Sequence, residues 1–116
     1  MEYYQHLCLD SLPLDVRGIV LAAVRTLIER GPHGLVEDGL CPLEAEQSMV
    51  ANLSDYPGQL IDPPGSAELW GHANADGKWT IDFPLHNDRG GRMDLFLFLE
   101  VNPKDRAVEV TGLYTP

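Results

Sequence analysis

Apolar positions along the chain recur with two different periods, and the change of period divides the sequence into two halves. From Pro13 to Arg30 the apolar residues have the i, i+3, i+4, i+7 spacing of an amphipathic helix. They are Val16, Ile19, Val20, Ala23, Val24, Leu27 and Ile28. Pro13 suits the first helical turn, and Gly31 with Pro32 ends the pattern. The spacing predicts a helix over 13–30 that packs on an apolar surface.

A second, shorter helix is predicted after a Gly/Pro-rich connection over residues 31–42. It begins at Pro42 and extends to about Leu53, with Leu43, Val50 and Leu53 facing inward. Residues 54–66 contain three prolines and two glycines, a composition that is typical of a loop.

From Ala67 onward the apolar residues alternate with polar ones, which is the period of a strand. Four strands are predicted, at 67–73, 78–85, 92–102 and 107–115. Their short turns favour an antiparallel meander. The sequence therefore predicts a single α+β domain over 1–116, with two N-terminal helices packed on a curved four-stranded sheet. In the third strand Phe96 and Phe98 face away from its leucines, so a helix, a partner or a curl of the sheet is expected to cover that second side.

This order of elements resembles the NTF2-like or cystatin-like cone. The C-terminal half is also similar to an uncharacterised bacterial domain family, whose pattern is a Trp-led strand, an acidic Gly-containing turn, and Asp-Leu-x-Leu-x-Leu before a closing strand. The matching residues are Trp79, Ile81, Asp88–Gly91, Asp94, Leu95, Leu97, Leu99 and Val108–Leu113. Members of such families are often small immunity proteins found beside bacterial toxins, or proteins with no known role, so the resemblance implies no particular site residues.

Charge is distributed unevenly along the chain. The net charge is −10 and the pI is about 4.5, which argues against nucleic acid or an anionic membrane as a partner. Between Arg30 and Lys78 there is no lysine or arginine, whereas eight acids occur there: Glu37, Asp38, Glu44, Glu46, Asp55, Asp62, Glu68 and Asp76. A one-signed stretch of this kind creates a local field that attracts a cationic protein.

The first functional hypothesis is therefore a non-enzymatic protein-binding module, specifically an immunity-type inhibitor of a basic toxin. Tyr56 is a candidate aromatic anchor, since tyrosine is enriched at binding hot spots. The predicted partner-binding residues are Glu37, Asp38, Glu44, Glu46, Asp55, Tyr56 and Asp62. The alternative interpretation of these acids is a solvated surface that only keeps the protein soluble.

The second hypothesis is a small-ligand-binding protein or enzyme of the NTF2-like kind. A four-residue turn at 74–77 would place His72 opposite Trp79 and Trp70 opposite Ile81, on one apolar face. The predicted pocket residues are Trp70, His72, Trp79 and Phe83, with His72 as a candidate general base. A third hypothesis, compatible with both others, is a homodimer formed through the open sheet face.

Other chemistry has little support in the sequence. No two histidines have metal-ligand spacing, and no motif for a nucleophile, a phosphate or a nucleotide occurs, so neither a metal nor a cofactor is expected. The first twelve residues have no basic stretch typical of a secretory signal, which favours a cytoplasmic location. In that setting Cys8 and Cys41 are expected to be buried thiols, and a disulfide between them would require oxidising conditions.

Overall fold

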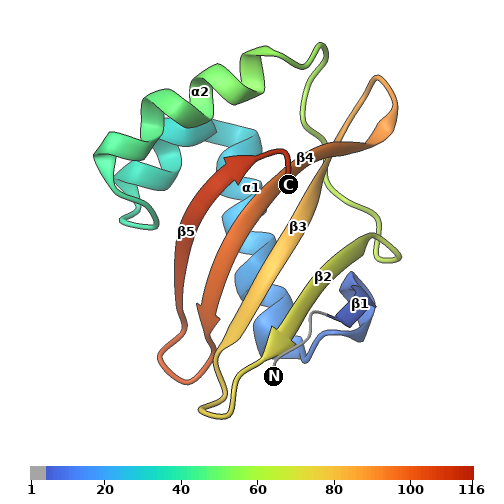
Figure 1. Cartoon of the computed structure of the whole chain (residues 1–116), viewed down its shortest axis with the longest axis vertical. Coiled ribbons are helices and arrows are strands. Elements are labelled where there is room, and N and C mark those ends of the chain that lie inside the picture. Colours follow the sequence, from blue (N-terminus) through green and yellow to red (C-terminus); the bar gives the residue numbers. More distant parts are fainter. Residues whose placement is uncertain (1–4) are drawn as a thin grey trace.

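A computed structural model describes residues 5–116, and it has two helices and one five-stranded antiparallel sheet (Figure 1). The helices are α1 (Leu14–Glu37) and α2 (Glu46–Ser54). The strands are β1 (Gln5–Cys8), β2 (Glu68–Ala73), β3 (Trp79–Asn87), β4 (Gly91–Asn102) and β5 (Ala107–Tyr114), paired in sequence order. The predicted α+β class is confirmed, and the four predicted strands match β2 to β5 within two residues at each end.

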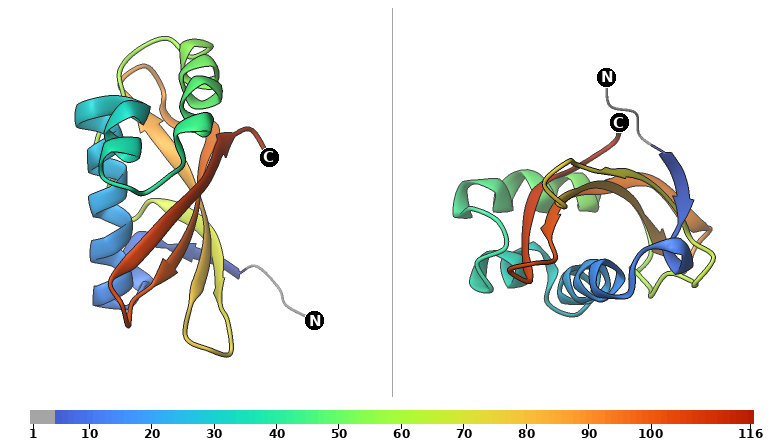
Figure 2. Two further views of the ribbon diagram at one scale, coloured as in Figure 1. Left: turned by 90° about the vertical axis from the view of Figure 1, so that its left-hand side faces the viewer. Right: turned by 90° about the horizontal axis from the view of Figure 1, so that it is seen from below.

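The sheet curves around α1, which lies along its concave side (Figure 2). The alternation of the strands turns one set of side chains toward the helix, and these side chains form the core. Ile81, Phe83 and Leu97 are completely buried there, in one cluster with Val20 and Leu27 of α1. No helix within residues 5–116 is long and apolar enough to cross a membrane.

Helix α1 is broken at Gly31, whose φ of 70° and ψ of −170° are not helical. The predicted stop at this residue is therefore present, but the chain resumes a helical path at Pro32 and continues to Glu37. Pro32 favours this restart because its fixed φ suits a first helical position. Leu35 is fully buried in the core and holds the resumed turns in place. The predicted connection over 31–42 was therefore too long.

Strand β1 is the fifth strand, which the sequence pattern did not predict. It pairs antiparallel with β2, from Gln5 opposite Gly71 to Cys8 opposite Glu68. Beyond the strand, the Leu9 N–H donates to the Ala67 carbonyl at 2.8 Å. Four residues are too few to show a period of two, so only the pairing with β2 defines this strand.

Helix α2 lies beside β5, at the edge of the sheet (Figure 1). The Asn52 side-chain amide donates to the Leu113 carbonyl at 2.6 Å, which satisfies a group on the open edge. Met49 is the buried residue of α2, whereas Leu43 and Val50 are 68% and 50% exposed. Their predicted inward orientation is wrong, because a 3-10 turn over Leu43–Ala45 changes the helical phase before α2 begins.

The loop between α2 and β2 is fixed to the far end of β3. The Ile61 N–H donates to the His86 carbonyl at 2.9 Å, and the Asn87 side-chain amide donates to the Pro57 carbonyl at 3.1 Å. His86 and Asn87 are the buried polar residues of the described chain. The Gly/Pro-rich loop is thus irregular, as predicted, and yet anchored.

Candidate functional site

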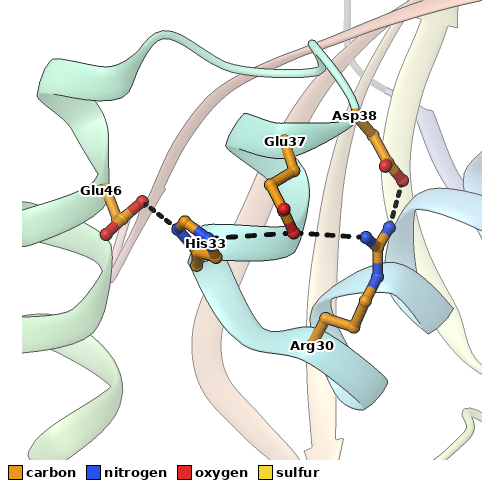
Figure 3. A network of polar contacts seen from close by, with 5 residues as sticks. All are labelled: Arg30, His33, Glu37, Asp38 and Glu46. Atoms are coloured by element: carbon orange, nitrogen blue, oxygen red, sulfur yellow. Dashed lines mark hydrogen bonds and ion pairs between the residues drawn. The ribbon is translucent and has the colours of Figure 1, made fainter.

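The acids nearest the end of α1 contact Arg30 and His33 of the same helix, as Figure 3 shows. Arg30 forms ion pairs with Asp38 and, at 3.5 Å, with Glu37. Asp38 is the main cause of the raised pKa of the Arg30 guanidinium. His33 lies 3.1 Å from Glu46 of α2 and 3.8 Å from Glu37. Three of the predicted partner-binding carboxylates therefore have intramolecular partners.

The other predicted partner-binding residues are spread over the helical side of the molecule. Asp62 lies 3.7 Å from Arg25 in the middle of α1. Glu44 and Asp55 are exposed, and neither forms an ion pair within residues 5–116. Tyr56 donates its hydroxyl to Asp94 at 2.6 Å, and this hydrogen bond is the main cause of its raised pKa. Arg25 and Arg30, which precede the acid-only segment in the chain, thus form ion pairs with three of its eight carboxylates.

The four predicted pocket residues lie on opposite faces of the sheet. Ala73, not His72, is opposite Trp79, and Trp70 is opposite Asp82. The turn is one residue longer than predicted, since the Asn74 N–H bonds to the Lys78 carbonyl at 2.6 Å. A shift of one residue reverses every side chain of the strand. Trp70 and His72 therefore lie on the convex face, whereas Trp79 and the fully buried Phe83 face the helix.

No helix covers the convex face of the sheet (Figure 2). This face carries a continuous row of rings. His6 of β1 stacks on Trp70 of β2, with centroids 5.0 Å apart, and Trp70 lies 5.7 Å from Phe96 of β4. Phe98 lies 6.3 Å from Phe96 and stacks at 4.3 Å on Tyr114 of β5. We call these five residues the aromatic row; it extends from one edge of the sheet to the other.

Acidic groups surround the aromatic row. The register and alternation of the strands place five carboxylates on this convex face, at Glu68, Asp82, Asp94, Glu100 and Glu109. Among the described strands, β4 places one arginine, Arg92, on this face. Its guanidinium lies 2.9 Å from the Glu68 carboxylate and 5.2 Å from the Trp70 ring centroid. With histidines counted as neutral, the convex face is clearly anionic.

Asp82 is the carboxylate nearest the middle of the row. It is opposite Trp70 on one side and Phe98 on the other. Burial is the main cause of the raised pKa of Asp82, and the nearby His72 partly offsets it. His72 lies close to Asp82 on the convex face.

A separate cleft of about 490 Å³ opens at the end of the sheet where the β2–β3 and β4–β5 turns lie. Trp79, Lys78 and Cys41 are among its lining residues. Burial raises the pKa of the Cys41 thiol, which favours an unreactive protonated form. Cys8 and Cys41 are both free. Among residues 5–116, no three His, Cys, Asp or Glu side chains gather closely enough to hold a metal ion.

Sequence reasoning missed the aromatic row, although it noticed that Phe96 and Phe98 face away from the leucines. The missing information was the register of the β2–β3 hairpin and the presence of β1, which together bring His6 and Trp70 to the same face. Comparison of the chain with protein-family models, with curated proteins and with solved structures found no match.

Proposed function

We propose that the protein is a non-enzymatic binding module for a basic protein, and that the partner docks on the aromatic row. The observation that carries this proposal is the uninterrupted row of five rings on a convex, helix-free sheet face bordered by carboxylates. His6 and Tyr114 at the ends of the row are exposed, Trp70 and Phe98 are half-buried, and Phe96 in the middle is buried. A partly exposed apolar patch bordered by polar groups is typical of protein interfaces. Aromatic side chains supply much of the energy of such interfaces.

The charge of the face favours a basic partner over a second copy of this chain. In a symmetric dimer the same anionic surface would face itself, and repulsion between like charges would oppose association. A cationic partner gains attraction from the carboxylates around the row instead. Neutralisation of a basic toxin, as the resemblance to immunity proteins implies, is one instance of this function. The curved meander around one long helix supports an NTF2-like or cystatin-like architecture for the module.

A peptide titration tests the docking surface. Fluorescence anisotropy is measured with a labelled short peptide that alternates arginine and leucine, and with a matched peptide of glutamate and leucine. We expect only the basic peptide to bind, and Trp70→Ala or Phe98→Ala to weaken its binding by about tenfold or more. The matched controls are Glu44→Gln and Asp55→Asn, which remove exposed acids from the helical side.

Three outcomes contradict the proposal. Equal losses in the aromatic variants and in the controls would indicate general charge attraction without a docking surface. Loss in the controls alone would place binding on the helical side. A concentration-dependent dimer, detected by light scattering and abolished by Phe98→Ala, would identify a second copy as the occupant.

A second candidate function, small-ligand binding, is supported by the cleft lined by Trp79. Its volume of about 490 Å³ lies within the usual range for ligand sites. A thermal-shift screen with small molecules, repeated on Trp79→Phe, tests it. A compound that raises the melting temperature of the wild type but not of Trp79→Phe would support ligand binding in the cleft. If no compound raises the melting temperature, the result would argue against this function.

A further inference from the structure

We propose that Asp82 is the anchor for an arginine side chain of the partner, whose guanidinium lies between the rings of Trp70 and Phe98. This inference rests on the proposed function and names the chemistry of the docking partner. The proposed subsite lies at the centre of the convex face. Its carboxylate belongs to β3, which contributes no ring to the aromatic row.

The position of Asp82 follows from the register of three strands. Trp70, Asp82 and Phe98 are directly opposite one another in β2, β3 and β4. The Cβ atoms of directly opposite residues lie about 5 Å apart, so an aromatic side chain flanks the Asp82 carboxylate on each side. Trp70 contacts Phe96, and Phe98 stacks on Tyr114. Each flanking ring is thus held in place by another ring of the row.

The carboxylate is partly buried between these rings. Burial raises its pKa, although His72 on the same face partly offsets the effect. No lysine or arginine of residues 5–116 forms an ion pair with Asp82, whereas Glu68 on the same face has Arg92. An aspartate is also a poor residue for a central strand. Asp82 therefore costs the free protein stability, which is a common property of groups that serve binding.

The neighbouring Arg92 provides an internal template for the proposed contact. Its guanidinium lies 5.2 Å from the Trp70 ring centroid while it donates to Glu68 at 2.9 Å. The same face therefore already holds one arginine between a tryptophan and a carboxylate. Asp82 and Phe98 offer a carboxylate and a ring to an arginine from outside, beside a Trp70 ring that already contacts His6 and Arg92.

Arginine fits this subsite better than lysine. The guanidinium is planar, so it stacks on aromatic rings and donates two parallel hydrogen bonds to one carboxylate. An ammonium is a compact, strongly hydrated charge that cannot form both contacts at once. A partner that inserts arginine is thus distinguished from one that is only positively charged.

The subsite is tested by NMR titration with N-acetyl-arginine amide, with N-acetyl-lysine amide as the comparison probe. The two tryptophan indole N–H signals are internal reporters, since Trp70 lies beside Asp82 and Trp79 on the opposite face. We expect the arginine probe to shift the Trp70 signal and to leave the Trp79 signal in place. The lysine probe is expected to bind at least about threefold more weakly.

Asp82→Asn is the decisive variant, and Glu109→Gln is its matched control, because it removes an exposed acid from the same face. We expect Asp82→Asn to weaken the arginine probe by about threefold to tenfold and Glu109→Gln to leave it nearly unchanged. Equal affinity for the two probes, or equal loss in both variants, would overturn the subsite.

These results separate the subsite from the docking surface. If the arginine–leucine peptide loses affinity in Trp70→Ala but not in Asp82→Asn, docking stands and the anchoring role of Asp82 is wrong. If the peptide binds no better than its acidic counterpart, the proposed function itself fails, whatever the small probes show.

Discussion

Trp70 and Trp79, the two tryptophans of the chain, lie on opposite faces of one sheet although they belong to neighbouring strands. Ala73 is opposite Trp79, so Trp70 shares its face with Asp82 and not with Ile81. This relationship places Trp79 on the helix-facing side of the sheet, against the core, and Trp70 in the aromatic row on the convex face.

Gly31 and Gly18 are expected to respond in opposite ways to alanine. Gly31 has φ 70° and ψ −170°, a region that is strained for any residue with a Cβ. Gly31→Ala should therefore lower the free energy of unfolding by about 1–3 kcal/mol. Gly18 is helical, and a Cβ added there would have no neighbouring atom within 4 Å, so Gly18→Ala should raise it by about 0.5–1 kcal/mol. Urea unfolding of both variants checks the pair; a stabilised Gly31→Ala would show that the break is not strained.

The two faces of the sheet should differ in their contribution to stability. Phe83 is completely buried against the helix, so Phe83→Ala should cost about 3–5 kcal/mol. Phe98 on the convex face is only partly buried, and Phe98→Ala should cost clearly less. Chemical denaturation of both variants measures the difference. Equal costs would mean that the convex face is as essential to the fold as the core, against its assignment as a binding surface.

Asp82 should reduce stability at neutral pH. Burial raises its folded-state pKa above the ordinary value of 3.8, so the folded state binds more protons than the unfolded state between these two values. The free energy of unfolding therefore falls as pH rises through that window, and the penalty persists above it. Asp82→Asn should be more stable than the wild type at pH 7, with a gain that shrinks toward pH 3.8. If the free energies of unfolding of Asp82→Asn and the wild type differ by the same amount at all pH values, the raised pKa of Asp82 is contradicted.

His86 should make the protein sensitive to mild acid. Burial, and secondarily Arg92, lowers the folded-state pKa of His86 below its ordinary value of 6.5. The unfolded state then binds more protons in the window below 6.5, so stability is full above this pH and is lost as pH falls through the window. His86→Gln, which does not titrate, should lose less stability over the same range. Thermal unfolding followed from pH 7.5 downward checks this, and an equal loss in both proteins would contradict it.

The sequence by itself determined the elements whose signal is local. The apolar stripe from Val16 to Ile28 predicted the first part of α1, and the alternation after Ala67 predicted β2 to β5. Gly31 marked the break in the helix. The apolar stripe and the strand alternation are each repeated over several residues that are close in the chain. Neither distant contacts nor strand register were needed to recognise them.

Only the tertiary structure decided which side chains gather on the convex face. The sequence predicted the acid-only segment as the binding surface, and in the fold Arg25, Arg30 and His33 of α1 contact four of its eight carboxylates. One extra turn residue placed Trp70 and Asp82 on the convex face, and β1 added His6 beside them. Pairing between distant residues depends on turn length and side-chain reach. Neither is encoded in the local spacing of apolar and charged residues, which is why the aromatic row emerged only from the folded chain.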